Sequence, residues 1–268
     1  MHTAKKPTYG KNHRYGMVID LDRCTGCGAC MVACAVENNV PPGDPAANER
    51  TGISWLRVYR MNDGKPLPET RTAFVPVPCQ QCGVSTPCLS VCPQNAVDVD
   101  QSSGIVGQIP VRCLGCRYCM AACPYHARSF NWWDPVWPAE MRGSLNPDVS
   151  TRTRGVVEKC NFCFHRLQAA RAKAAAEGRL DEGPEAYQPA CVEACPAAAI
   201  VFGDLDDPGS AVSKAAAGEG TFRLLEKLGT DPKVVYRSGR AWVRDAAAAG
   251  LPEAGRRANG KSEGQVHG

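Results

Sequence analysis

No stretch of this sequence approaches the run of about 18 apolar residues that a membrane-spanning helix needs, so we expect no membrane span in the chain. The N-terminal segment MHTAKKPTYGKNHRYGMVID is basic and polar, and it lacks the apolar stretch of a secretory signal. We therefore expect one of two locations. The protein is either cytoplasmic or exported in the folded state on a partner that carries the signal.

The sequence also lacks the G-x-G-x-x-G, P-loop and G-x-S-x-G motifs, and its 5 histidines are scattered. No constellation of catalytic side chains is visible. His126 and His165 follow cysteines closely. Each is a candidate for tuning a metal centre or relaying a proton to a quinone, although a surface or supporting role is the interpretation we favour.

Cysteine is the residue present in excess, with 16 among 268 residues. The cysteines fall into four sets that each begin with C-x-x-C and end with C-x-x-x-C. The gap between the two pairs is 2, 5, 2 and 27 residues in sets one to four. The sets are Cys24, Cys27, Cys30, Cys34; Cys79, Cys82, Cys88, Cys92; Cys113, Cys116, Cys119, Cys123; and Cys160, Cys163, Cys191, Cys195.

The spacing C-x-x-C-x-x-C-x-x-x-C-P is typical of [4Fe-4S] ligands, in which three thiolates hold one cluster and the fourth closes a second. Zinc is an alternative because C-x-x-C pairs also bind zinc, but a third cysteine two residues on fits tetrahedral zinc poorly. Disulfides are a second alternative, which the missing secretion signal disfavours. We therefore expect iron-sulfur clusters.

The formal net charge of +4 indicates weak affinity for nucleic acid at most, and no nucleic-acid partner is expected. Sixteen thiolates around four cluster cores of about +2 each would bring the net charge to about −4. Several basic residues lie beside the cysteines. They either compensate buried clusters or serve solubility, and they are Arg23, Arg112, Arg117, Lys159 and Arg166.

Short alternating segments separate the cysteine sets and predict strands at 16–22, 53–60, 96–100, 104–111 and 198–204. The segments 96–100 and 104–111 predict a hairpin. Each repeat is expected to be a strand, a cysteine loop, one or two helical turns after the last cysteine, and a strand. Strong helix formers at 165–183 predict a longer helix, 221–229 an amphipathic helix and 234–243 an extended segment. From Asp245 the composition predicts a flexible tail or an arm that orders on a partner.

Four segments carry a specific resemblance: VIDLDRCTGCGACMVACAVENN, CQQCGVSTPCLSVCPQNAV, VRCLGCRYCMAACPYHAR, and EKCNFCFHR followed by PACVEACPAAAI. Over residues 16 to 203 the chain resembles the four-cluster ferredoxin-type subunits of molybdopterin-type membrane oxidoreductases. This family includes the electron-transfer subunits of polysulfide, dimethyl sulfoxide, tetrathionate and nitrate reductases, and of the related menaquinone reductase complex.

The resemblance implies an α+β fold made of two nested two-cluster ferredoxin-like modules. The outer module would comprise residues 14–75 with 155–203, the inserted module 76–154, and a C-terminal extension and tail 204–268. It also implies four ligand groups that mix the sets. These are Cys24, Cys27, Cys30 and Cys195; Cys34, Cys160, Cys163 and Cys191; Cys79, Cys82, Cys88 and Cys123; and Cys92, Cys113, Cys116 and Cys119. Some relatives replace the cysteine at this position of the third set and hold a three-iron cluster there. Cys116 is a cysteine in this sequence, so four [4Fe-4S] clusters are expected, with one three-iron cluster as the alternative.

The function implied is a relay without a substrate of its own. Single electrons would pass between a large molybdopterin-type catalytic subunit and a polytopic membrane quinone-binding subunit, with a cytochrome c subunit as a further candidate partner. We expect the periplasmic face of the inner membrane, with the cytoplasm as the alternative. Docking would use the tail and the aromatic run FNWWDPVW at 130–137, which is equally consistent with a core role. The alternative function is a ferredoxin-like subunit of a soluble dehydrogenase or hydrogenase.

Ala35 follows Cys34, whereas proline follows Cys92, Cys123 and Cys195. Proline lacks the backbone N–H and cannot continue a helix. We therefore predict that the helix after Cys34 is longer than any helix after Cys92, Cys123 or Cys195.

Overall fold

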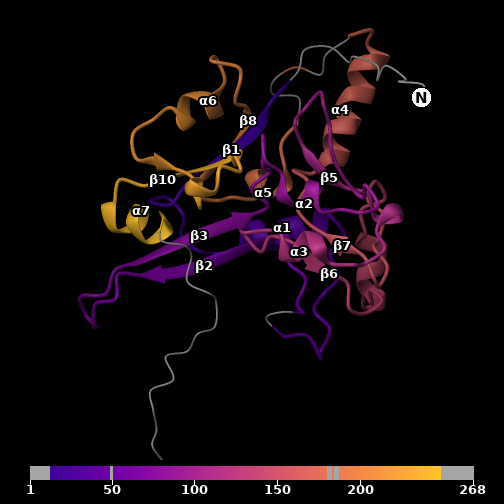
Figure 1. The fold of residues 1–268 in the computed structure, drawn as a ribbon, viewed down its shortest axis with the longest axis horizontal. Coiled ribbons are helices and arrows are strands. Elements are labelled where there is room, and N and C mark those ends of the chain that lie inside the picture. Colours follow the sequence, from indigo (N-terminus) through magenta and orange to yellow (C-terminus); the bar gives the residue numbers. More distant parts are fainter. Residues whose placement is uncertain (1–12, 49–50, 180–182, 184–186, 249–268) are drawn as a thin grey trace, which may run out of the picture.

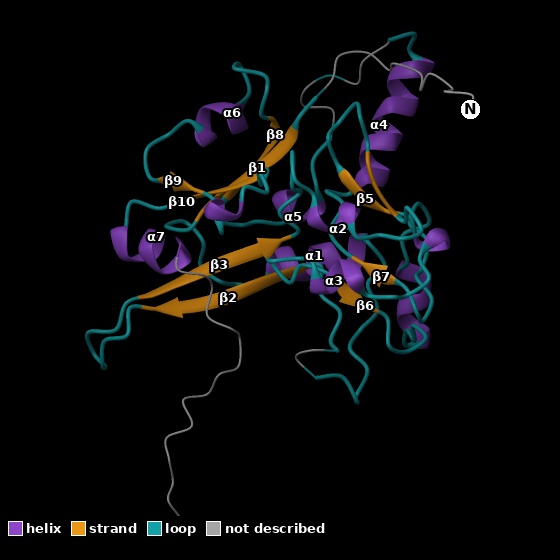
Figure 2. Ribbon diagram, in the orientation of Figure 1, coloured by secondary structure: helices purple, strands orange, loops and turns teal. Residues whose placement is uncertain are grey.

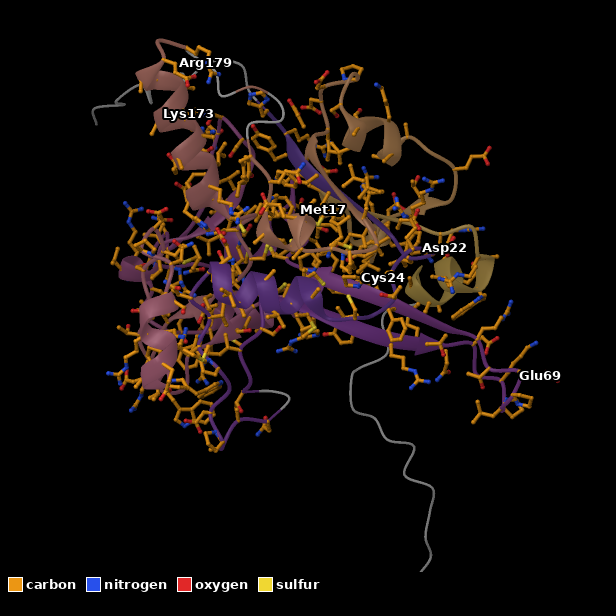
Figure 3. The ribbon with its side chains drawn as sticks, turned by 180° about the vertical axis from the view of Figure 1, so that it is seen from behind. Met17, Asp22, Cys24, Glu69, Lys173 and Arg179 are labelled. Carbon is orange, nitrogen blue, oxygen red and sulfur yellow. The ribbon has the colours of Figure 1, made fainter. Side chains whose placement is uncertain are left out.

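The computed structural model describes residues 13–48, 51–179, 183 and 187–248. Strands and short helices alternate along the chain in a mixed α+β fold (Figures 1 and 2). Four helices gather in the middle of the molecule, namely α1 (Ala29–Glu37), α2 (Pro87–Ser90), α3 (Tyr118–Ala121) and α5 (Ala190–Glu193) (Figure 1). The hairpin of β2 (Leu56–Asn62) and β3 (Thr72–Pro78) extends away from them (Figure 1). Figure 3 shows Glu69 at the outer end of this hairpin and Met17 in the body of the molecule.

The largest sheet has four strands in the order β8, β1, β10, β9. β1 (Tyr15–Asp20) pairs antiparallel with β8 (Ile200–Asp204) and parallel with β10 (Val234–Arg237), and β9 (Thr221–Phe222) forms the edge. The C-terminal extension thus adds two strands to a sheet begun by the first cysteine repeat.

The two faces of this sheet are buried against different partners, because successive side chains of a strand point to opposite faces. Met17 and Ile19 pack into the main core together with cysteines from several sets. Val18 and Val235 pack instead against Val212 of α6 (Ala211–Ala216), which covers the other face. The sheet therefore forms one wall of the cysteine-rich core.

Each cysteine set lies between two strands, as the sequence predicts. The elements of the four repeats are β1, α1 (Ala29–Glu37) and β2 (Leu56–Asn62); β3 (Thr72–Pro78), α2 (Pro87–Ser90) and β4 (Val97–Val99); β5 (Val106–Gln108), η1 (Pro110–Arg112), α3 (Tyr118–Ala121) and β6 (Ser129–Phe130); and β7 (Val157–Glu158), α4 (Phe164–Ala176), α5 (Ala190–Glu193) and β8. The predicted β4–β5 hairpin is confirmed, and so is the long helix between Cys163 and Cys191. β2 pairs with β3, and β6 pairs with β7.

The prediction for Ala35 is confirmed. α1 has 9 residues and continues past Cys34 to Glu37, whereas α2, α3 and α5 have 4 residues each and end before Cys92, Cys123 and Cys195. The helical turns of these three repeats were predicted after the last cysteine, and that placement is wrong. They lie before it, because the following proline cannot take a place in a continuing helix.

The C-terminal predictions are partly wrong. Residues 221–229 form the strand β9 and the 3-10 turn η3 (Glu226–Leu228), since Phe222 pairs and stacks with Tyr236 of β10 and Leu225 has a φ of +50°. Residues 234–243 begin as β10, but α7 (Ala241–Ala248) starts within them. α7 also occupies the first part of the expected tail, and residues 249–268 lie outside the described residues.

None of the helices in the described part of the chain combines the length and the apolar character needed to span a bilayer. The 3-10 turn η2 (Ala139–Ser144) completes the elements, and it lies in the segment between β6 and β7.

Candidate metal centre: four groups of cysteine thiols

Cysteines from different repeats line three common cavities in the structure. Each cavity has four thiols in its wall, three from one set and one from another. The groups are Cys24, Cys27, Cys30 and Cys195; Cys79, Cys82, Cys88 and Cys123; and Cys92, Cys113, Cys116 and Cys119. We call them the first, third and fourth thiol groups.

The second thiol group comprises Cys34, Cys160, Cys163 and Cys191, all of which are buried. Burial, followed by the neighbouring thiols Cys160, Cys191 and Cys163, raises the pKa of Cys34 well above its ordinary value. The structure thus brings together the cysteines of each group that the resemblance implies. Their role as ligands stays a prediction.

The local backbone presents each set of thiols to its cavity. Gly26, Gly28 and Gly115 have φ values of +72°, +79° and +76° in the cysteine loops. At Gly115 a Cβ atom would lie 2.3 Å from the carbonyl oxygen of Gly155, so only glycine fits this turn. The loop of the fourth thiol group therefore packs directly against the backbone that precedes β7.

The chemistry of the donors fits [4Fe-4S] clusters. Burial raises the pKa of Cys30 to about 11 and that of Cys82 to about 12, with neighbouring thiols adding to the shift. Four thiolates around one cavity therefore need positive charge at its centre, which cluster iron supplies. The backbone N–H groups of Ala96 and Ala199 donate to the sulfurs of Cys92 and Cys195 at 3.2 and 3.3 Å.

Two buried polar atoms beside the thiols point to a further acceptor. Among the described residues, the Tyr187 hydroxyl and Nη2 of Arg128 are buried without a hydrogen-bond partner. Tyr187 lies near the thiols of Cys163 and Cys160, and Arg128 lines the cavity of the third thiol group. Cluster sulfides would satisfy both donors, because buried polar groups are ordinarily hydrogen-bonded.

The four groups form a row. Besides burial, Cys30 of the first group contributes to the raised pKa of Cys34 in the second. In the same way, Cys79 of the third group helps to raise the pKa of Cys160 in the second. Cys88 of the third group helps to raise the pKa of Cys119 in the fourth. Each group therefore lies close to the next one in the row.

The two ends of the row reach the surface. Cys27 of the first group is exposed, and Cys92, Cys113 and Cys116 of the fourth are half-buried. All four cysteines of the second group and three of the four in the third are buried, with Cys123 half-buried. The interior groups are thus shielded, while the terminal groups lie where a partner protein can approach.

A polar network that the sequence did not reveal supports the second group. The Asn38 side chain donates to the sulfurs of Cys34 and Cys163 at 3.8 and 3.7 Å. Arg152 donates to the Asn39 carbonyl oxygen at 3.1 Å and, through Nε, to Glu158 at 2.8 Å. Glu158 accepts two further bonds, from Trp55 at 2.8 Å and Asn131 at 2.6 Å. These polar residues are scattered along the sequence and follow no helix or strand periodicity, so sequence patterns could not predict the network.

The basic residues singled out in the sequence divide into three kinds. Lys159 is buried and lies near Cys160, and Arg166 lies near Cys163, where it also pairs with the carboxylates of Glu37 and Glu193. Arg117 stacks on Phe130 and Trp132, at 5.3 and 4.9 Å from their ring centroids. Arg23 and Arg112 are exposed, as expected for a role in solubility.

The histidines and the aromatic run lie outside the thiol groups. His126 is exposed, and His165 contacts the Glu37 carboxylate at 2.6 Å through Nε2. In the run 130–137 the side chains of Trp132 and Trp133 are half-buried. The run therefore combines a core role with partial surface exposure.

All 16 cysteines are free of disulfides. Within residues 13–48, 51–179, 183 and 187–248, no three or more His, Cys, Asp or Glu side chains are arranged to hold a single metal ion. The thiols are instead spaced around cavities.

Three family descriptions match the chain. A 4Fe-4S binding domain matches residues 15–36, and 4Fe-4S dicluster domains match residues 70–138 and 105–196. With the 16 cysteines, these matches confirm that the chain binds multiple [4Fe-4S] clusters.

Curated proteins extend the match to most of the chain. The chain is 55% identical over 235 residues to the iron-sulfur cluster-binding subunit of menaquinone reductase from Nitratidesulfovibrio vulgaris, covering 86% of this chain and 91% of that protein. It is 41% identical to a putative dimethyl sulfoxide reductase iron-sulfur subunit from Halobacterium salinarum, over 84% of this chain and 79% of the relative. It is 35% identical to an arsenate respiratory reductase iron-sulfur subunit from a Shewanella species, over 83% of this chain and 95% of the relative.

Proposed function

Because the chain belongs to the family of iron-sulfur electron-transfer subunits of oxidoreductase complexes, we propose that it relays single electrons between two partner subunits through four [4Fe-4S] clusters. One partner is a large molybdopterin-type catalytic subunit. The other is a polytopic membrane subunit that binds quinone, and a cytochrome c subunit is a further candidate. The relay has no substrate of its own.

The observation that carries this proposal is the row of four thiol groups, whose two ends reach the surface. Cys30 and Cys34 lie on one helix, four residues apart, and face different groups. Four residues of α-helix rise by about 6 Å, so centres held by these two cysteines are close neighbours. Cys191 of α5 and Cys195, which follows the end of α5, also belong to two different groups, the second and the first. Electrons can therefore pass from group to group within the protein.

The proposed ligands follow the thiol groups. Cys24, Cys27, Cys30 and Cys195 hold the first cluster, Cys34, Cys160, Cys163 and Cys191 the second, Cys79, Cys82, Cys88 and Cys123 the third, and Cys92, Cys113, Cys116 and Cys119 the fourth. The first and second groups form the outer module, residues 14–75 with 155–203. The third and fourth form the inserted module, residues 76–154, and residues 204–268 are the extension.

The bound clusters supply reversible one-electron chemistry, and the chain's own residues supply the setting for it. Backbone N–H groups donate to ligand sulfurs, as Val157 does to Cys113 at 3.4 Å. The aromatic core around Tyr15 and Phe202, whose rings stack at 5.7 Å, excludes water from the second group. Water exclusion and hydrogen bonding both set the potential at which an electron is accepted.

Exposed apolar side chains flank both ends of the row. Val32 of α1, two residues after Cys30 of the first group, is 65% exposed, and Leu114 and Tyr118 are 56% and 64% exposed beside the fourth. In this proposal the first end faces the catalytic subunit and the fourth end faces the membrane subunit. The aromatic run 130–137 and the C-terminal tail add to the docking surface.

We place the protein at the periplasmic face of the inner membrane, held there by its partners, with the cytoplasm as the alternative. The relatives named for menaquinone and dimethyl sulfoxide reductases support a membrane-linked complex. Protease treatment of spheroplasts tests the side. Degradation before lysis supports the periplasm, and protection until lysis contradicts it.

Anaerobic co-purification of the native complex tests the function. We expect a molybdopterin-type subunit and a polytopic membrane subunit to purify with the chain, and reduced menaquinone or the catalytic substrate pair to change the oxidation state of the clusters. A soluble flavin or hydrogenase subunit as the sole partner would contradict the proposal and support the cytoplasmic alternative.

A further inference from the structure

Arg128 is a buried cation placed between two thiol groups. Its side chain is only 5% exposed, and it lines the cavity of Cys79, Cys82, Cys88 and Cys123. Its Nη1 donates to Gln108 Oε1 at 2.8 Å, and Gln108 lines the neighbouring cavity of Cys92, Cys113, Cys116 and Cys119. The residue thus contacts the wall of both cavities.

Thiols of two groups surround the buried charge of Arg128. The thiols of Cys88, in the third group, and Cys119, in the fourth, lie near its guanidinium. Burial alone would lower the pKa of Arg128, but the thiols of Cys88, Cys119 and Cys79 raise it above its ordinary value. Within the described residues no carboxylate forms an ion pair with it.

The other buried arginine among the described residues, Arg152, differs in this respect. Arg152 is paired with the Glu158 carboxylate at 2.8 Å, and this carboxylate largely cancels the charge of Arg152. Nη2 of Arg128, in contrast, is buried without a partner. A buried donor of this kind needs an acceptor inside the cavity.

We propose that Arg128 is a positioning residue that raises the reduction potentials of the third and fourth clusters together, and so favours an electron at that end of the row. This inference rests on the proposed function. One-electron reduction adds one negative charge to a cavity. The guanidinium keeps its proton throughout, so its positive charge stabilises the reduced state with no proton taken up.

The location makes the effect selective. Coulomb interactions are strong across short distances in a buried setting and are screened over longer ones. Arg128 lines the cavity of the third group and donates to Gln108 in the wall of the fourth, and the thiols that contribute most to its raised pKa belong to these two groups. Two of the four potentials should therefore respond to it.

The test is an EPR-monitored redox titration of the full chain carrying its clusters, with Arg128→Gln, Arg128→Lys and the control Arg223→Gln. The control also removes one positive charge, but Arg223 donates to the Pro232 carbonyl oxygen at 3.0 Å, away from the cavities. We expect Arg128→Gln to lower two of the four midpoint potentials by an amount that does not vary with pH. Arg128→Lys should give a smaller lowering of the same two, and Arg223→Gln should leave all four unchanged.

Unchanged potentials in Arg128→Gln, or an equal shift of all four, would overturn the inference. If Arg128→Gln takes up fewer clusters, Arg128→Lys is titrated in its place, because this variant keeps the positive charge and changes only its geometry. A small lowering of the same two midpoint potentials supports the inference, and an equal shift of all four overturns it. A wild-type chain with fewer than four reducible clusters would contradict the proposed function instead, so the two failures are distinguishable.

Discussion

Cys30 and Cys34 lie one turn apart on α1, yet their thiols belong to different groups. Cys30 lines a cavity with Cys24, Cys27 and Cys195, whereas Cys34 interacts chiefly with Cys160, Cys191 and Cys163. Because the helix continues through Ala35 to Glu37, it fixes the separation of the two thiols. α1 is therefore the rigid link between the first two centres of the row.

Replacing these two cysteines should affect different clusters. Cys34→Ala should remove about four iron atoms and the signal of the second cluster, and Cys30→Ala the same amount and the signal of the first. Iron assays and EPR of the reduced variants measure both effects. Loss of the same signal in both variants would contradict the division of α1 between two groups.

Asn38 should raise the potential of the second cluster alone, because its amide donates to the sulfurs of Cys34 and Cys163. Hydrogen bonds to ligand sulfur stabilise the more negative, reduced state. A difference of about 1 kcal/mol corresponds to roughly 40 mV for one electron. In an EPR redox titration, Asn38→Leu should lower one midpoint by about that amount. A rise, or a shift of several midpoints, would contradict this role.

Two glycines of the cysteine loops form a matched pair. Both have φ near +76° to +79°, but a Cβ at Gly115 would meet the Gly155 oxygen at 2.3 Å, whereas nothing lies within 4 Å of one at Gly28. Gly28→Ala should cost about 1 kcal/mol of stability and keep its iron. Gly115→Ala should cost about 3 kcal/mol or more and lose the fourth cluster. Thermal unfolding and iron content test this, and equal effects of the two variants would contradict it.

The buried pair Glu158 and Arg152 should matter for stability. Both side chains are less than 5% exposed, and removing the carboxylate leaves a buried positive charge. Glu158→Ala should therefore cost about 3–5 kcal/mol, or roughly 10 °C in Tm. Glu177→Ala breaks a half-exposed pair with Arg179, which solvent screens, and should leave Tm nearly unchanged. Similar Tm values for the two variants would show that the buried network is not stabilising.

The sequence predicted those features that depend on local spacing. The cysteine sets, the strands flanking them, the β4–β5 hairpin and the long α1 all follow from residue spacing and from the position of proline. The cofactor could be predicted in the same way, because three cysteines at intervals of three residues can ligate three iron atoms of one [4Fe-4S] cluster.

The remaining features depend on contacts between distant residues. β10 pairs with β1, whose residues lie more than 200 positions earlier, and this pairing draws Phe222 into a strand where helix was predicted. α7 forms because the alanine-rich segment favours helix, and because Val243 and Ala247 are buried in the main core. Arg128 and Asn38 are single polar residues, and only the fold brings them to the thiols.

The iron, labile sulfide and zinc contents of the anaerobically purified chain test the central claim most directly. Four [4Fe-4S] clusters on all 16 cysteines predict about 16 iron and about 16 sulfide per chain, with no stoichiometric zinc. About 15 iron with a strong EPR signal in the fresh oxidised protein would show one three-iron cluster and contradict the expectation for Cys116. About 8 iron, or stoichiometric zinc without labile sulfide, would contradict a four-cluster relay.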